Sequence, residues 1–169
     1  WFFLKPYQKM RLLIFLDPMV DPQGAGYNVI QSKIAVGSGG LLGKGFLQGT
    51  QGKLHFLPEP HTDFIFSVFS EEFGFVGSFV VLLLFFLLLT KLLSVSQYTK
   101  DLRAKLLVTT IATWLWFQIT ESIAMSMGLA PITGIPLPLF SYGGSSLIAV
   151  AIALALVQSV AIVSKEDRF

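Results

Sequence analysis

The sequence predicts an all-α integral membrane protein, a polytopic helix bundle with a large extracellular loop that carries short helices. Its composition supports this class, because 53% of the residues are hydrophobic and only 13% are charged, whereas soluble domains carry about 25% charged residues. Three apolar stretches, residues 73–90, 106–127 and 147–163, come close to or exceed the roughly 20 residues that span a bilayer as a helix. The net charge of +2 gives no support to nucleic-acid binding, and the lack of cysteine excludes disulfides.

Residues 1–16 are expected to form the end of a preceding transmembrane helix and the start of an outer loop. The chain opens on Trp1, and "WFFL" lacks the charged and small-residue features of a signal peptide. We therefore expect the sequence to be the C-terminal part of a longer protein.

Residues 17–63 predict a large extracellular loop. Two Asp-Pro pairs in "DPMVDPQGAGY" indicate turns, and Tyr27, Ile30 and Ile34 stand at the spacing of a short amphipathic helix. Seven glycines within residues 37–52 are interleaved with large apolar side chains. A long loop of this kind is usually functional, and we expect it to be ordered at the outer membrane face.

The remaining elements follow from hydropathy and from the basic residues. We expect transmembrane helices over residues 64–90, 106–127 and 145–163, a cytoplasmic loop over 91–105, an extracellular or re-entrant loop over 128–144, and a cytoplasmic tail over 164–169. The first of these loops carries four basic residues, whereas residues 128–144 carry none. The positive-inside rule therefore places residues 91–105 in the cytoplasm.

Titratable groups gather in "FLPEPHTDFIF", residues 56–66, directly before an apolar run. Pro60 favours a helix start just downstream, with His61 or Thr62 near the N-cap and Asp63 in the first turn. Asp63 could then complement the helix dipole. At a boundary between water and lipid it could instead act as a base that takes a proton from a substrate hydroxyl.

A metal site in the same segment is a further possibility. His55, Glu59 and His61 together with Asp63 lack the regular spacing of a helical zinc motif. A magnesium ion held between Asp63 and a substrate phosphate needs only one or two protein ligands, and is the favoured interpretation.

Three more glutamates are candidates. On a continuous helix Asp63 and Glu71 lie about 80° apart and share a broad face, whereas Glu72 points away and is expected in the headgroup layer. Glu121 lies about 9 Å below the outer end of its span. At that depth it is either a functional group or a buried carboxyl that helps the helices pack.

The stretch "GLAPITGIPLPLFSYGGSS", residues 128–146, has three prolines and no charge. Such a backbone is tolerated at membrane depth only where protein or a cavity satisfies it, and amides around "SYGGSS" could bind an anion at a helix N-terminus. Together with "LDPMVDPQGAGYNVIQSKIAVGSGGLLGKGFLQGTQ" and "FLPEPHTDFIFSVFSEEFGFVG", this stretch resembles the SEDS family, the RodA, FtsW and SpoVE proteins of bacterial cell-wall synthesis. "GKGFLQGTQ" is similar to the RodA branch, whereas Glu121 and Ser122 depart from the family pattern.

The resemblance implies a ten-helix protein of the bacterial cytoplasmic membrane, of which this chain would hold the last three helices. It implies a peptidoglycan glycosyltransferase that polymerises lipid II during cell elongation. The implied partners are the lipid bilayer, a class B penicillin-binding protein and other membrane proteins of the elongation machinery. The essential aspartate of the family maps by motif onto Asp63, which we expect in the catalytic loop as general base and magnesium ligand. The expected substrate-binding residues are Lys33, Lys44, Lys53, Glu59, His61, Thr62, Ser141 and Tyr142.

Two alternative functions stay open. A lipid II flippase or transporter would use polar groups deep in the bundle, and Gln118 and Glu121 are such groups. A non-catalytic scaffold that activates a penicillin-binding protein would show an exposed apolar helix face without an acidic loop cluster. Because the acidic cluster around Asp63 is present, the sequence favours an enzyme.

Overall fold

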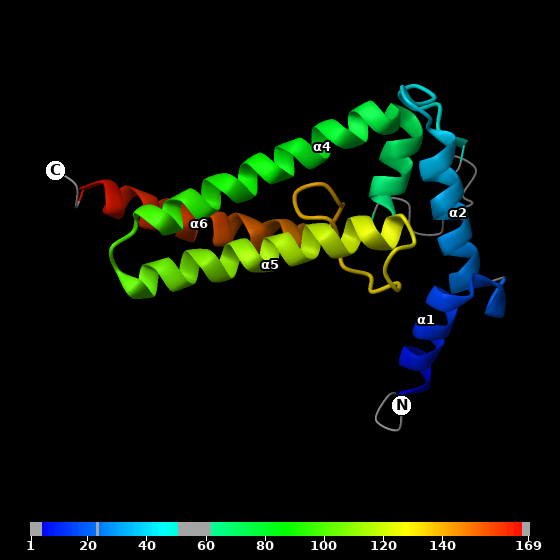
Figure 1. Cartoon of the computed structure of the whole chain (residues 1–169), viewed down its shortest axis with the longest axis horizontal. Helices are drawn as coiled ribbons and strands as arrows, with labels where there is room; N and C mark the ends of the chain where they lie inside the picture. The colour runs from blue at the N-terminus through cyan, green and yellow to red at the C-terminus, as the bar shows by residue number, and fades with distance from the viewer. Residues whose placement is uncertain (1–4, 23, 51–61, 167–169) are drawn as a thin grey trace.

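The computed structural model describes residues 5–22, 24–50 and 62–166. Within these ranges every regular element is helical, which confirms the predicted fold class for the described residues. The elements are α1 (Pro6–Leu16), the short 3-10 helix η1 (Pro18–Val20), α2 (Ala25–Ser38), α4 (Ile65–Tyr98), α5 (Leu102–Ser126) and α6 (Gly144–Glu166) (Figure 1). The predictions for Lys53, His55, Glu59 and His61 lie outside the described residues.

Three long helices form the body of the molecule. α4 and α5 run antiparallel, and α6 packs against both (Figure 1). Buried side chains from all three helices meet in one apolar cluster: Leu92, Val108, Ala112, Leu115, Val150 and Val157. At the far end, the Oγ1 atom of Thr99 and the Oγ atom of Ser164 are hydrogen-bonded at 3.1 Å, so the end of α6 meets the turn between α4 and α5.

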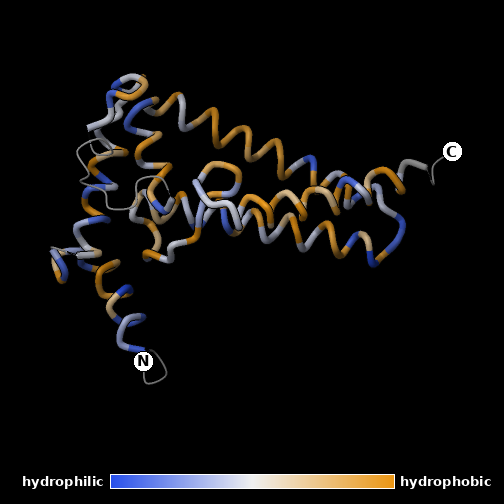
Figure 2. The backbone as a smooth tube through the Cα atoms, turned by 180° about the vertical axis from the view of Figure 1, so that it is seen from behind, coloured by the Kyte–Doolittle hydropathy of each residue, from blue (hydrophilic) through white to orange (hydrophobic). Residues whose placement is uncertain are grey.

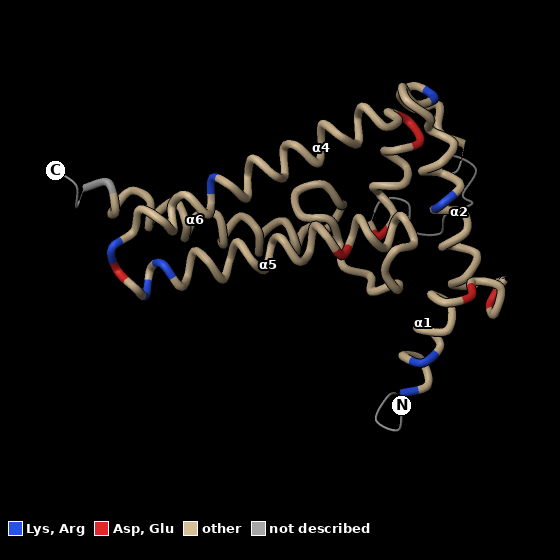
Figure 3. Tube along the Cα trace, viewed as in Figure 1, with Lys and Arg blue, Asp and Glu red and all other residues tan. Residues whose placement is uncertain are grey.

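The long helices have the dimensions and surface of membrane spans. α5 has 25 residues and α6 has 23, which at 1.5 Å per residue gives about 34–38 Å, more than the roughly 30 Å of a bilayer core. α4 and the Gly144–Ser164 segment of α6 are both long and apolar enough to cross a membrane, and only 17% of each apolar window is buried. A core helix of a soluble protein would be mostly buried, so this exposure favours lipid contact. Hydrophobic residues predominate along these helices (Figure 2). Charged residues are sparse along them and gather at the turn between α4 and α5 and on the side of the molecule that holds α1 and α2 (Figure 3).

α4 is broken at Gly74, which divides it into a first arm (residues 65–73) and a second arm (residues 75–98). Gly74 has φ 64° and ψ −161°, a combination that is essentially restricted to glycine. The sequence predicted one uninterrupted helix over residues 64–90, and its continuity and end are wrong: the helix runs from Ile65 to Tyr98 and is broken at Gly74. The expected loop over residues 91–105 therefore shrinks to the turn between Tyr98 and Leu102.

The break is covered by a glycine-rich loop (residues 39–45). The N–H groups of Lys44 and Gly45 donate to the carbonyl oxygens of Glu71 and Glu72, both at 3.0 Å. The carbonyl oxygens of Gly40 and Leu41 in turn accept from the N–H groups of Phe75 and Val76, at 2.9 and 3.1 Å. Four backbone groups that the break removes from the helix ladder are thus satisfied by the loop, as burial or a lipid environment requires.

α2 packs against both the first arm of α4 and the end of α5. It has 14 residues and is longer than the short helix expected from Tyr27, Ile30 and Ile34. Ser32 of α2 hydrogen-bonds both the hydroxyl of Ser67 in α4 and the carbonyl oxygen of Ser126 in α5, and all three serines are fully buried. Small hydroxyl side chains allow this close approach of three helices, and their hydrogen bonds satisfy buried polar groups.

Candidate active site

Asp63 lies in a turn directly ahead of α4. The helix begins at Ile65 with Phe64 as N-cap, and Phe64 has a non-helical backbone and makes no side-chain cap. The prediction that Asp63 occupies the first helical turn is therefore wrong, and so is the argument that Asp63 and Glu71 share a helix face. Phe64 and Phe66 are 3% and 2% exposed. These two buried rings anchor the start of the helix, whereas Asp63, directly before them in the sequence, is half-buried.

The loop between α5 and α6, residues 128–143, holds this turn in place; we call it the signature loop. The hydroxyl of Ser141 donates to the carbonyl oxygen of Thr62 at 2.7 Å and accepts from the N–H of Leu137 at 2.9 Å. Leu137 is 1% exposed and packs with side chains of both α4 and α5. The loop thus folds back between the helices, and Ser141 connects two segments that are 79 residues apart.

The carboxylate of Asp63 faces Gly134 of the signature loop. A Cβ atom at Gly134 would lie 3.4 Å from Oδ2 of Asp63, and Gly134 has φ +74°. Any other residue at position 134 would adopt a left-handed conformation that costs about 1 kcal/mol or more, with its side chain against the carboxylate. The left-handed torsion, rather than lack of space, is therefore what favours glycine at this position.

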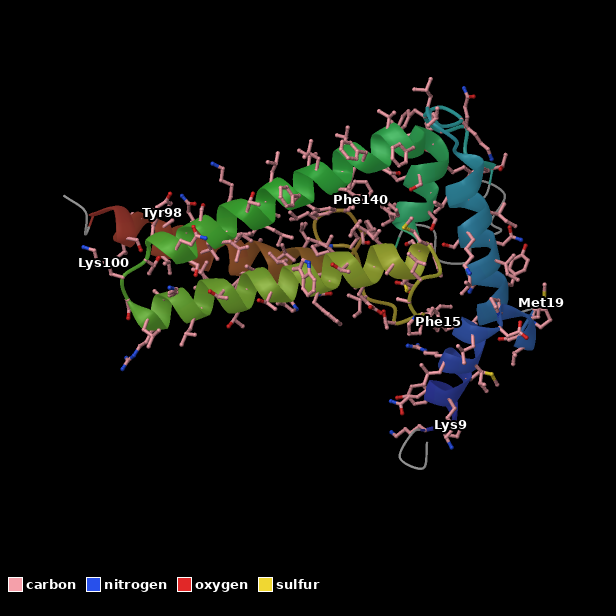
Figure 4. The ribbon with its side chains drawn as sticks, in the orientation of Figure 1. Lys9, Phe15, Met19, Tyr98, Lys100 and Phe140 are labelled. Atoms are coloured by element: carbon pink, nitrogen blue, oxygen red, sulfur yellow. The ribbon has the colours of Figure 1, made fainter. Side chains whose placement is uncertain are left out.

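A cleft of about 590 Å³ opens beside this turn. It is lined by Ile65 of α4, by residues 139–144 and by Leu147 of α6, and includes the predicted residues Ser141 and Tyr142. Leu139 adopts φ 62°, and a non-glycine residue held in this region is strained, a feature that clusters at functional sites. Phe140 lies between the helices (Figure 4), its ring edge-on to Phe69 with centroids 5.1 Å apart.

Two cations contact the signature loop. Lys33 of α2 crosses Gly128 so closely that a Cβ atom there would overlap its side chain, and Gly128 has φ +68°. Arg11 of α1 donates from Nη1 to the carbonyl oxygen of Thr133 at 3.4 Å, next to Gly134. Sequence analysis missed Arg11, because nothing in its local pattern separates it from an ordinary surface charge and its contact is 122 residues away.

Lys44, expected to bind substrate, has a protein partner. Its ammonium group forms an ion pair with Glu71 at 2.6 Å. Glu71 is fully buried, whereas Glu72, expected in the headgroup layer, is half-buried. Glu71 thus forms a buried ion pair with Lys44 and is not grouped with Asp63 on one helix face.

The remaining candidates are less well placed. Glu121 is half-buried in α5, and the hydroxyl of its neighbour Ser122 is buried without a hydrogen-bond partner among the described residues. In the part of the chain that the structure describes, no three His, Asp or Glu side chains are grouped so as to hold a metal ion. The magnesium prediction depends on Asp63 and on residues outside that part.

Known proteins resemble this chain over nearly its whole length. The family profile for FtsW, RodA and SpoVE, described as "Cell cycle protein", matches residues 1–166. "Peptidoglycan glycosyltransferase RodA" of Treponema pallidum (strain Nichols) is 50% identical over 157 residues, 93% of this chain and 36% of that protein. "Peptidoglycan glycosyltransferase MrdB" of Escherichia coli (strain K12) is 47% identical over 161 residues, 95% of this chain and 44% of that protein. The chain therefore spans less than half the length of these relatives.

Solved structures support the same relationship. A chain in a structure described as "Structural coordination of polymerization and crosslinking by a peptidoglycan synthase complex" matches with a TM-score of 0.73 and 43% identity, covering 95% of this chain and 43% of that one. The rod shape determining protein RodA of Thermus thermophilus matches with a TM-score of 0.54 and 32% identity, covering 89% of this chain and 54% of that one. On this evidence the chain belongs to the FtsW, RodA and SpoVE family of membrane proteins.

Proposed function

We propose that the full-length protein is a peptidoglycan glycosyltransferase that polymerises lipid II during cell elongation. The names of the relatives from Treponema pallidum and Escherichia coli support the activity. The observation that carries the proposal is the hydrogen bond from Ser141 to Thr62, which holds the turn of Asp63 against the signature loop and beside the cleft. Two segments with family motifs are thereby assembled into one site.

The position of Asp63 suits a lipid-linked substrate. Lipid II keeps its undecaprenyl tail in the bilayer and presents its pyrophosphate and sugars at the surface, so its polymerase needs a catalytic group where a membrane helix meets water. Asp63 stands at the start of α4, whose second arm is apolar and exposed. The apolar side chains of Ile65, Leu139 and Leu147 in the cleft suit contact with the lipid.

In the proposed reaction the carboxylate of Asp63 acts as general base. It accepts the proton of the acceptor sugar 4-hydroxyl as that oxygen attacks the anomeric carbon of the donor. The bond from that carbon to undecaprenyl pyrophosphate breaks, and the configuration inverts. Thr62, Ser141 and Tyr142 are proposed to contact or position the substrate, and Lys53, Glu59 and His61 stay predictions.

The leaving pyrophosphate requires positive charge. Arg11 and Lys33 contact the signature loop and are the described cations best placed to supply it. A magnesium ion, if used, fits the oxygen chemistry of Asp63, because this ion needs one or two carboxylates and completes its shell with phosphate and water. It would supply charge neutralisation of the pyrophosphate, and Asp63 would be its protein ligand.

We further propose that the Asp63 end of the bundle faces the outside of the cytoplasmic membrane. The turn between α4 and α5, at the opposite end, is flanked by Lys100, Arg103 and Lys105, as the positive-inside rule expects of a cytoplasmic turn. A class B penicillin-binding protein is the proposed partner, because a structural relative belongs to a peptidoglycan synthase complex. Other membrane proteins of the elongation machinery stay a prediction.

The test uses the full-length protein, purified with its penicillin-binding partner, whose transpeptidase is blocked by antibiotic. Labelled lipid II and magnesium are added, and the glycan product is separated on a gel for wild type, Asp63→Asn and Asp101→Asn. Asp101 caps α5 at the other end, where Asn caps equally well. We expect wild type and Asp101→Asn to give a glycan ladder and Asp63→Asn to give none.

Either other outcome is informative. A ladder from Asp63→Asn would remove Asp63 from the role of base. No ladder from wild type, under conditions where a known polymerase works, would overturn the proposed function in favour of transport or scaffolding, and Glu121 would be tested next.

A further inference from the structure

Glu71 is a buried carboxylate at the end of the first arm of α4, and the proposed chemistry does not use it. Its Oε1 atom accepts from Nζ of Lys44 at 2.6 Å, from the N–H of Thr50 at 2.9 Å and from Oγ1 of Thr50 at 2.8 Å. Glu71 is 0% exposed and Lys44 is 32% exposed. A charge is costly to bury, and buried ion pairs are weak evidence for stability by themselves, so this arrangement calls for another explanation.

The three residues stand where the backbone of α4 is interrupted. Lys44 belongs to the glycine-rich loop that satisfies the broken ladder at Gly74. The loop backbone lies so close that a Cβ atom at Gly39 would meet the carbonyl oxygen of Ser70, and one at Gly43 would meet that of Glu72. The side chains of Lys44 and Thr50 therefore add hydrogen bonds to Glu71 beside the backbone bonds that join the glycine-rich loop to the first arm.

We propose that Glu71, Lys44 and Thr50 form a positioning lock that fixes the first arm of α4 and thereby places Asp63. Asp63 precedes the first arm, and the break at Gly74 ends it. A rotation of the first arm about Gly74 would therefore move Asp63, so that the arm acts as a lever with the break as its hinge. Asp63 and Gly74 are eleven positions apart, which would be about 16 Å if the whole stretch were helical, and a tilt of about 5° would then move Asp63 by roughly 1.4 Å. A misplacement of about 1 Å can cost roughly 100-fold in rate. This inference rests on the proposed function and adds positioning residues to it.

The lock predicts kinetics that differ from those of a substrate-binding lysine. If Lys44 binds the pyrophosphate, Lys44→Met raises the KM for lipid II. If it belongs to the lock, Lys44→Met lowers kcat and leaves KM near its wild-type value, because bound substrate meets a displaced base.

The experiment uses the full-length protein with its penicillin-binding partner and labelled lipid II. The variants are Glu71→Gln, Lys44→Met and Thr50→Val, with Lys44→Arg as the conservative replacement that keeps the charge. Glu72→Gln is the matched control, because Glu72 is adjacent and forms no ion pair among the described residues. We expect kcat to fall roughly 10- to 100-fold in the first two variants, less in Thr50→Val, and to stay near wild type in Lys44→Arg and Glu72→Gln.

A second readout follows the lever itself. Spin labels at positions 68 and 87, one on each arm of α4, report the distance between the arms by pulsed electron resonance. We expect one narrow distance distribution in the labelled wild-type background, and a broader or shifted one when Glu71→Gln or Lys44→Met is added. Lys44→Arg should restore the narrow distribution.

Several results would overturn the proposal. These are an unchanged kcat in Glu71→Gln and Lys44→Met, a rise in KM alone, or a loss of kcat without any change in the distance distribution. If Glu71→Gln fails to fold, the kcat values and distance distributions of Lys44→Met and Thr50→Val test the proposal in its place. If the wild type makes no polymer, the proposed function fails and Asp63 has no such reaction to be positioned for, while the distances still show whether the lock holds the arm.

Discussion

The break in α4 offers the sharpest test of the structure, through the single substitution Gly74→Ala. Gly74 has φ 64° and ψ −161°, and an L side chain in that region costs about 1–3 kcal/mol. A Cβ atom at Gly74 would also meet backbone atoms of the glycine-rich loop, including N of Gly43 and the carbonyl oxygen of Leu41. Backbone cannot rotate away as a flexible side chain can, so the loop must move.

The loss can be sized from the bonds at risk. Four backbone hydrogen bonds join the loop to the two arms, at about 1 kcal/mol each. Losing two to four of them, in addition to the conformational cost, destabilises the protein by about 3–7 kcal/mol. At about 2 °C per kcal/mol, the unfolding temperature of the full-length protein in detergent should fall by about 6–14 °C.

Gly37→Ala is the matched control. Gly37 lies within α2, and no atom lies within 4 Å of a Cβ atom built there. Alanine is favoured over glycine in a helix interior by about 0.5–1 kcal/mol; because Gly37 is next to the last residue of α2, this variant should unfold between the wild-type temperature and about 2 °C above it. The reasoning is refuted if Gly74→Ala unfolds within about 2 °C of wild type, or if both variants lose stability equally.

Two further predictions concern the site. Ser141→Ala removes a hydroxyl that bonds both Leu137 and Thr62. The two backbone groups left unpaired should lower the free energy of unfolding by about 1–3 kcal/mol, and the loss of the bond to Thr62 should lower kcat for lipid II. Ser141→Thr keeps the hydroxyl and should retain more activity. Equal activity in both variants would show that the bond to Thr62 does not place Asp63. Arg11→Gln should raise the KM for lipid II about fivefold, equivalent to about 1 kcal/mol, with kcat less affected. Lys9→Gln on the same helix serves as the control. An unchanged KM in Arg11→Gln would remove Arg11 from the substrate site.

Hydropathy predicted the long helices, and the motif resemblance singled out Asp63, whose catalytic role stays a prediction. The long apolar runs made α4, α5 and α6 recognisable, because the free energy of transferring a segment into lipid is the sum of the contributions of its own residues. Helix boundaries were less well predicted, since α4 continues past Lys91 to Tyr98. The hydropathy of the sequence marks only where the apolar residues end, whereas the backbone hydrogen bonds of the helix continue beyond them.

The sequence by itself thus determined that this is a helical membrane protein, that it resembles one family, and that Asp63 is its leading candidate. Only the tertiary structure decided that α4 breaks at Gly74, that Lys44 pairs with Glu71 and that Asp63 faces Gly134. It also brought Arg11 to Thr133 across 122 residues of sequence. The physical reason is the range of the interactions: hydropathy and helix propensity act within one segment, whereas the torsion at Gly74 and the partners of these charged groups depend on which distant loop packs against them.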